Sequence, residues 1–240
     1  MPRRHLWVFS LLLLALFAGA SKVEATNVAA AADLKFALGE IAASYQKDTG
    51  RKVVLSFGSS GNFARQIPQG APFDLFLSAD EAYIFRLAGQ GWLRDEGRLY
   101  AIGRIALLAP HGSPLAVDGE LRDLAAALAD GRLQRLAIAN PQHAPYGRAA
   151  RAALEHAHLW QPLQGKLVLG ENVAQAAQFA LSGSAQGGIV AWSLVKAPEL
   201  ARLGAAALIP ESWHPPLRQR MALTRRADAD ASQFYDYLQQ

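Results

Sequence analysis

Apolar residues along this chain follow two alternating patterns. Short continuous apolar runs are typical of strands buried on both faces, and apolar residues three or four positions apart are typical of helices packed on one side. Residues 33–50 show the second pattern, with Leu34, Phe36, Leu38, Ile41 and Tyr45 at mostly helical spacing. Gly50 then predicts the end of this helix, because glycine readily adopts the left-handed conformation found at many helix C-termini.

The two patterns repeat in order along the chain. The expected strands are residues 27–32, 52–57, 73–79, 101–110, 133–140, 166–170 and 187–192. The expected helices are residues 33–50, 62–70, 81–92, 121–130, 148–159 and 171–183. This alternation indicates an α/β fold of mainly parallel sheets flanked by helices. The length of 240 residues suits two α/β halves.

The first 25 residues differ from the rest of the chain. Arg3 and Arg4 precede an apolar run that extends from Leu6 to Phe17, and small residues lead to Ala25. This pattern predicts a secretory signal peptide that is cleaved after Ala25. An uncleaved membrane anchor is the alternative, although the run is short for a membrane span. The mature chain is therefore expected outside the cytoplasm.

Charge and cysteine content narrow the function classes. The chain has 24 Lys and Arg residues and 20 Asp and Glu residues. The predicted leader contains three of the basic residues and one of the acidic residues. The mature chain therefore has 21 basic and 19 acidic residues, a net charge of +2. A nearly neutral mature chain gives no indication of a nucleic-acid partner. The absence of cysteine excludes disulfides, thiol catalysis and cysteine-ligated metal sites.

Four strand-to-helix corners are the candidate binding positions, at residues 29–34, 57–62, 144–148 and 170–175. In open α/β sheets, ligands bind beyond the carboxyl ends of the strands, where helices begin. A helix start has unpaired N–H groups and a partial positive charge. It can therefore bind an anion without lysine or arginine.

The corner FGSSGN adds the Ser59 and Ser60 hydroxyls between Gly58 and Gly61. It is not a Walker A loop, because no Gly-Lys-Ser/Thr follows, and it is not a GxSxG motif, because its glycines are three positions apart. Ser60 is either a hydrogen-bond donor to a ligand or the N-cap of a helix over residues 61–67.

The other corners offer one candidate residue each. Asp33 is expected to cap a helix over residues 34–46 rather than to contact a ligand, because aspartate is among the best N-cap residues. Tyr146 offers a hydroxyl to a ligand or simply a packed ring. Val173 offers a backbone N–H, or belongs to an ordinary first helical turn capped by Asn172.

Catalytic and metal-binding patterns are weak. The histidines have no metal spacing and are expected mostly at the surface: His143, His156, His158 and His214. Asp80 is interpreted as the cap of the helix that follows it. No Ser–His–Asp set can be placed from the sequence.

Taken in order, the corners point to a known family. The chain resembles the periplasmic molybdate-binding proteins of ABC transporters in the segments VAAAADLKFAL, SFGSSGNFARQIPQGAPFDLFLSADE, YAIGRIALLAP, AIANPQHAPYGRAA and ENVAQAAQFALSGSAQGGIV. The resemblance covers roughly residues 27–238, and the string from Gly58 to Glu81 is its most specific part.

The resemblance implies a two-lobed periplasmic binding protein of type II, not an enzyme. Such a protein closes on one tetrahedral oxyanion, molybdate or tungstate, and presents it to an ABC permease. It implies a monomer with no cofactor other than this ligand. One lobe is expected at residues 26–101 and 218–240 and the other at residues 102–217, so the chain crosses between the lobes twice.

The family's binding positions fall on Asp33, Ser60, Tyr146 and Val173. The resemblance implies neutral donors, namely hydroxyls and backbone N–H groups, which suit a fully deprotonated dianion. Such a donor ring disfavours protonated phosphate, which also needs an acceptor.

Asp33 departs from the family pattern, because many members have serine or asparagine at this position. A carboxylate that faced a dianion would repel it. One alternative is therefore a protein that binds another small oxyanion or a cation through Asp33. Another is a secreted serine hydrolase that uses Ser60, for which no histidine base can be placed. The fold also serves cytoplasmic regulators as an effector domain, an alternative that the leader argues against.

Overall fold

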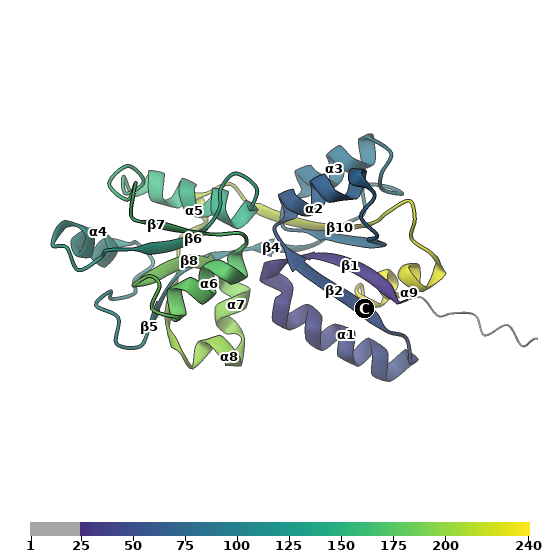
Figure 1. Cartoon of the computed structure of the whole chain (residues 1–240), viewed down its shortest axis with the longest axis horizontal. Coiled ribbons are helices and arrows are strands. Elements are labelled where there is room, and N and C mark those ends of the chain that lie inside the picture. The colour runs from purple at the N-terminus through teal and green to yellow at the C-terminus, as the bar shows by residue number, and fades with distance from the viewer. Residues whose placement is uncertain (1–24) are drawn as a thin grey trace, which may run out of the picture.

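The computed structural model describes residues 25–240. The predicted signal peptide, residues 1–25, lies outside the described residues except for Ala25. The described chain forms two α/β halves that lie side by side (Figure 1). None of the helices in the described part is both long enough and apolar enough to cross a membrane.

The first half is built on a five-stranded sheet with the order β2-β1-β3-β10-β4. Its strands are β1 (Thr26–Ala31), β2 (Val53–Gly58), β3 (Leu75–Ser78), β4 (Arg98–Gly103) and β10 (Leu217–Leu223). β1 pairs in parallel with β2 and β3, and β10 pairs antiparallel with β3 and β4. Four strands therefore run in one direction, and β10 runs against them.

The second half repeats this arrangement in the order β7-β6-β8-β5-β9. Its strands are β5 (Ile105–Pro110), β6 (Leu136–Ala139), β7 (Leu167–Gly170), β8 (Gly187–Ala191) and β9 (Gly204–Leu208). β6 pairs in parallel with β7 and β8, and β5 pairs antiparallel with β8 and β9. Here β5 is the reversed strand, so the expectation of mainly parallel sheets is confirmed in both halves.

Helices cover both faces of the first sheet. They are α1 (Lys35–Thr49), α2 (Ser60–Gln66), α3 (Glu81–Gly89) and α9 (Ala229–Tyr237), with the short 3-10 turns η1 (Ala32–Leu34) and η2 (Ile67–Gln69). Successive residues of β1 point to opposite faces, so Val28 packs with Tyr45 and Phe234 while Ala29 packs with Phe63 and Phe76. This double burial explains why the strand reads as a continuous apolar run.

The second half is held by one continuous core. Its helices are α4 (Arg122–Ala129), α5 (Pro145–His156), α6 (Val173–Leu181), α7 (Trp192–Lys196) and α8 (Pro198–Ala201), and η3 (Glu211–Trp213) follows β9. The chain passes from β4 to β5 through Arg104 and returns between β9 and β10. β4 extends to Gly103, past the lobe boundary expected at residue 101.

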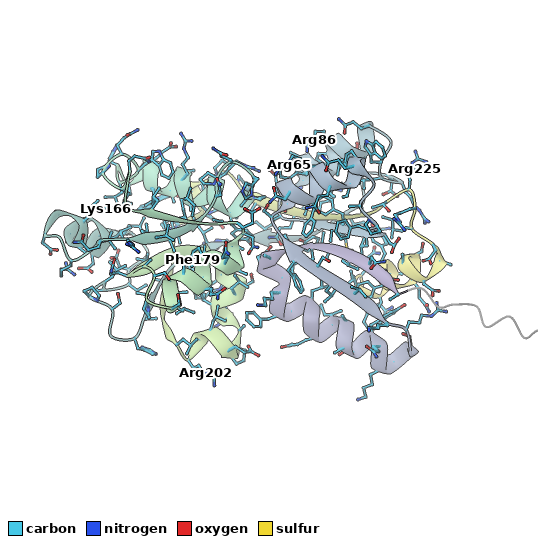
Figure 2. The ribbon with its side chains drawn as sticks, in the orientation of Figure 1. Arg65, Arg86, Lys166, Phe179, Arg202 and Arg225 are labelled. Atoms are coloured by element: carbon cyan, nitrogen blue, oxygen red, sulfur yellow. The ribbon has the colours of Figure 1, made fainter. Side chains whose placement is uncertain are left out.

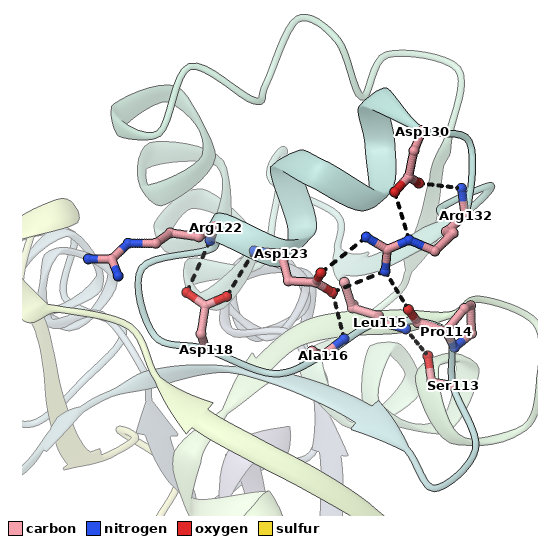
Figure 3. Close-up of polar contacts among 9 residues, drawn as sticks. All are labelled: Ser113, Pro114, Leu115, Ala116, Asp118, Arg122, Asp123, Asp130 and Arg132. Atoms are coloured by element: carbon pink, nitrogen blue, oxygen red, sulfur yellow. Dashed lines mark hydrogen bonds and ion pairs between the residues drawn. The ribbon is translucent and has the colours of Figure 1, made fainter.

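Polar contacts fix the loop before α4 at the far end of the second half (Figure 3). Asp118 accepts hydrogen bonds from the backbone N–H groups of Arg122 and Asp123, each at 3.0 Å. The Arg132 guanidinium bonds Asp123 and Asp130 at 3.1 and 2.8 Å, and its hydrogen bonds hold the pKa of the Asp123 carboxyl below its usual value. This network stabilises a loop that takes no part in the corners described below.

Several local predictions are confirmed. Gly50 ends α1 in the left-handed conformation with φ of 71°, and its N–H donates to the Gln46 carbonyl oxygen at 2.9 Å. Asp80 caps α3 by accepting from the Ala82 N–H at 2.9 Å. Asn172 caps α6 by accepting from the N–H groups of Ala174 and Gln175.

Candidate functional site

The four corners meet at one small cavity between the two halves. Its volume is about 10 Å³, room for about one water molecule. The lining residues come from the carboxyl ends of strands and the starts of α2, α5 and α6: Ala31, Ala32, Asp33, Gly58, Ser59, Ser60, Ala79, Ala144, Pro145, Tyr146, Asn172 and Val173. All four predicted site residues therefore line the same cavity.

Ser60 is the first residue of α2 and is fully buried. Its hydroxyl oxygen accepts a hydrogen bond from the Ala79 N–H at 2.9 Å. The N-cap of α2 is Ser59, with an extended backbone, so the alternative reading of Ser60 as the N-cap is wrong. The hydroxyl proton of Ser60 remains available to a ligand, since the contact with Ala79 uses only an acceptor lone pair.

Asp33 does not cap a helix, and the N-cap prediction for this residue is wrong. It lies within η1, and α1 begins only at Lys35, after Leu34, with no side-chain cap. The Asp33 carboxylate points instead to the second half and to β10. Its Oδ2 accepts from the Tyr146 hydroxyl at 3.0 Å and from Gln219 Nε2 at 2.8 Å.

The Asp33 carboxyl group is unusual in its burial. The residue is 3% exposed, and its Oδ1 has no hydrogen-bond partner within the described residues. Burial raises the pKa of this carboxyl from 3.8 to about 6, and the hydrogen bonds from Gln219 and Tyr146 oppose the shift only in part. Above pH 6 the cavity wall therefore carries a negative charge.

Tyr146 follows Pro145 at the start of α5 and is 4% exposed. Its hydroxyl donates to Asp33 and accepts from Gln219 Nε2 at 2.9 Å. Burial, and then the charge of Asp33, raise the pKa of the Tyr146 hydroxyl well above its usual value, so it remains a hydrogen-bond donor. Tyr146 is thus joined to the first half through Asp33 and Gln219.

Val173 is the first residue of α6 and is 3% exposed. The Asn172 side chain bonds the next two N–H groups, those of Ala174 and Gln175, so the Val173 amide lies outside both cap bonds. This amide is at the positive end of the helix, where an anion is stabilised.

Among the described residues that line the cavity, none has a basic side chain. In Figure 2, the labelled Arg86, Arg202 and Arg225 lie at the periphery of the molecule. The positive potential in the cavity therefore comes from helix starts and hydrogen-bond donors. At 4 Å and an effective dielectric constant of 20, an ionised Asp33 would repel a dianion by about 8 kcal/mol, twice the value for a single pair of unit charges.

Contacts on the rim of the cavity join the two halves. The Gly61 N–H donates to the His143 carbonyl oxygen at 2.9 Å, and Ser59 Oγ bonds His143 Nδ1 at 2.9 Å. His143 is 9% exposed and His214 is 6% exposed, so the expectation of surface histidines is wrong for these two. Arg148 on α5 binds Asp80 of the first half at 2.5 Å.

Sequence reasoning missed three residues of this region. Gln219 lies on β10, far along the chain from Asp33, and its strand offers no local pattern that marks a site. In the sequence Ser59 is only one residue of the corner, and its partner His143 is 84 positions away. These contacts depend on tertiary structure.

Comparison with known proteins agrees with the fold. The family model described as "Bacterial extracellular solute-binding protein" matches residues 26–240. The molybdate-binding protein ModA of Azotobacter vinelandii is 37% identical over 226 residues, which cover 93% of this chain and 87% of the relative. ModA of Escherichia coli strain K12 is 33% identical over 88% of this chain and 82% of the relative.

The solved structure of the Azotobacter vinelandii periplasmic molybdate-binding protein superposes with a TM-score of 0.79. The identity is 32%, and the match covers 90% of this chain and 93% of that one. The expected two-lobed α/β fold and the resemblance to molybdate-binding proteins are confirmed by these matches. The chain belongs to the family of bacterial extracellular solute-binding proteins.

Proposed function

We propose that this protein is a periplasmic solute-binding protein that captures molybdate or tungstate between its lobes and delivers it to an ABC permease. It acts by binding and not by catalysis, as a monomer, after removal of residues 1–25. The first lobe contains residues 26–103 and 217–240, and the second contains residues 105–209. These are the two sheets with their helices, joined by two crossings.

One observation carries this proposal: neutral donors from both lobes converge on a single buried cavity. Ser60 contributes its hydroxyl from the first lobe, and Val173 contributes its N–H from the second. Tyr146 lines the same cavity from α5. Charge-assisted hydrogen bonds of this kind bind a compact anion strongly when they are shielded from water. The relatives named for molybdate binding support the choice of oxyanion.

Access to the cavity is provided by a larger groove between the lobes. This groove has a volume of about 740 Å³, and Ala32 and Asn172 line both it and the small cavity. Lys35 and Phe36 of α1 form part of its wall. The small cavity is too narrow for a tetrahedral oxyanion as it stands, so binding requires the lobes to move apart slightly and close again.

Two alternatives from the sequence, a cation-binding protein and a secreted serine hydrolase, lack support in the site. A cation would need several oxygen ligands, and Asp33 is the only acidic residue in the lining within residues 25–240. For the hydrolase alternative, Ser60 accepts from the Ala79 amide, whereas His143 bonds Ser59. That histidine therefore does not serve as a base for Ser60.

Isothermal titration of residues 26–240 with molybdate, tungstate, sulfate and phosphate tests the proposal. We expect the first two anions to bind at least about 100-fold more tightly than the last two, a difference of about 2.7 kcal/mol. Equal or tighter binding of phosphate would contradict a site made for a fully deprotonated dianion. Size-exclusion chromatography of the same sample tests whether the protein is a monomer.

A further inference from the structure

In the described part of the chain, Asp33 is the one acidic side chain in the wall of the proposed anion site, and the family chemistry does not account for it. Its Oδ2 is used twice, by Tyr146 and Gln219, whereas its Oδ1 is buried without a partner in the described part of the chain. An ionised carboxylate in this position leaves one oxygen unsatisfied and repels the ligand. A protonated carboxyl removes both problems, because Oδ1 then carries a hydrogen that can be donated.

The groups around Asp33 do not stabilise its charge with a cation. Tyr146 on α5 and Tyr100 on β4 are the titratable groups that face it, and burial keeps the pKa of both hydroxyls well above the usual value. β10 contributes the neutral Gln219, and α7 contributes Ser193, whose hydroxyl donates to the Asp33 backbone oxygen at 2.8 Å. Lys35 on α1 lines the neighbouring groove.

We propose that the site binds its oxyanion together with one proton, which Asp33 Oδ1 takes up and donates to an oxygen of the ligand. This inference rests on the proposed function and adds a specificity-determining residue to it. The step is balanced: one proton from the solvent and one dianion enter the site, and the complex carries one negative charge less than the sum of an ionised Asp33 and the dianion. Tyr146 and Gln219 hold Oδ2, so that Oδ1 is the oxygen presented to the ligand.

Proton uptake makes the affinity depend on pH in a defined direction. Since the pKa of Asp33 in the unliganded protein is about 6, the carboxyl is largely ionised at pH 8 and must be protonated on binding. The affinity of the wild type therefore falls about tenfold for each pH unit between pH 7 and 8.5. It changes little between pH 5 and 5.5, where the carboxyl already carries its proton.

Asp33→Asn provides the matched variant, because an amide can donate a hydrogen permanently from Nδ2 while its oxygen still accepts from Tyr146 and Gln219. Its affinity should not depend on pH over this range. At pH 8 it should bind molybdate up to about 100-fold more tightly than the wild type, since two pH units separate pH 8 from the pKa of Asp33.

The experiment is calorimetric titration of the mature chain with molybdate at pH 7, 7.75 and 8.5, in HEPES and in Tris. The two buffers differ in ionisation enthalpy, so the difference in measured heat counts the protons taken up. We expect close to one proton for the wild type and for the control Asp236→Asn, whose side chain is exposed on α9, and none for Asp33→Asn. Asp33→Ser, a smaller neutral variant, should also take up none.

The outcomes separate this inference from the proposed function. If the wild type binds molybdate without proton uptake and with constant affinity, the inference is wrong and the proposed function stands. If Asp33→Asn still takes up a proton, the proton resides elsewhere and the inference is again wrong. If neither molybdate nor tungstate binds the wild type or the Asp33 variants at any of these pH values, the proposed function fails, and the inference fails with it.

Discussion

Replacing Asp33 by asparagine should stabilise the unliganded protein, and the gain should grow with pH. The pKa of this carboxyl is raised from 3.8 to about 6 in the folded chain, chiefly by burial. The folded state therefore holds the proton more tightly than the unfolded state does, and ionisation destabilises the fold. At about 1.36 kcal/mol for each of about two pKa units, the penalty is about 3 kcal/mol.

The penalty has a definite pH window. It is absent only well below the unfolded-state pKa of 3.8, where the carboxyl is protonated in both states, increases as the pH rises toward 6, and is nearly complete above that. Asparagine cannot ionise, yet its oxygen can still accept from Tyr146 and Gln219. The free energy of unfolding of Asp33→Asn relative to the wild type should therefore increase by about 2.5 kcal/mol between pH 4 and pH 8, because a small part of the penalty is already present at pH 4.

Urea unfolding followed by tryptophan fluorescence at pH 4, 6 and 8 measures this change. Asp236→Asn, on the exposed face of α9, is the control for removal of a carboxylate and should show no comparable trend. The reasoning is refuted if the difference between Asp33→Asn and the wild type is the same at pH 4 and pH 8. A difference in the free energy of unfolding that does not change with pH would show only that the amide packs differently from the acid.

Three further predictions concern the other site residues and are checked by titration with molybdate and by thermal unfolding. Ser60→Ala removes a donor to a charged ligand, worth about 1.5–3 kcal/mol, so affinity should fall about ten- to a hundredfold, and unchanged affinity would exclude Ser60 from the site. Tyr146→Phe removes the hydroxyl that holds Asp33 Oδ2, so binding should weaken about tenfold or more while the protein stays folded; normal affinity together with a large loss of stability would indicate a purely structural ring. Gly61→Ala would place a Cβ 2.4 Å from the His143 carbonyl oxygen of the other lobe, so it should reduce affinity by preventing closure, whereas Gly39→Ala on α1 meets no atom within 4 Å and should bind normally. Equal affinities of the two glycine variants would show that this contact does not form in the bound state.

Much of the fold could be predicted because it depends on local patterns. The apolar run of β1 and the spaced apolar residues of α1 mark a buried strand and its following helix without any tertiary information. The caps at Gly50, Asp80 and Asn172 involve atoms no more than four residues apart. The resemblance to a family then placed the four corners around one ligand, which spacing alone could not do.

The role of Asp33 could not be predicted in the same way. Aspartate directly before a helix is typical of an N-cap residue, and the N-cap prediction that follows from this local pattern is wrong. Its partners are 113 and 186 positions away in sequence, on α5 and β10. The two long-range hydrogen bonds to Oδ2 are more favourable than a local N-cap bond. A buried carboxylate without donors costs more free energy than a helix end whose N–H groups can bond to water.

The position of β10 has a consequence for the order in which the chain folds. β10 lies between β3 and β4 in the first sheet, although it is the last strand in sequence, whereas the strands of the second sheet all fall between Ile105 and Leu208. During synthesis, the second sheet can be completed while β3 and β4 still have exposed edges. The first lobe can form only when the segment 217–223 is available, so the binding cleft is assembled as the last step of folding.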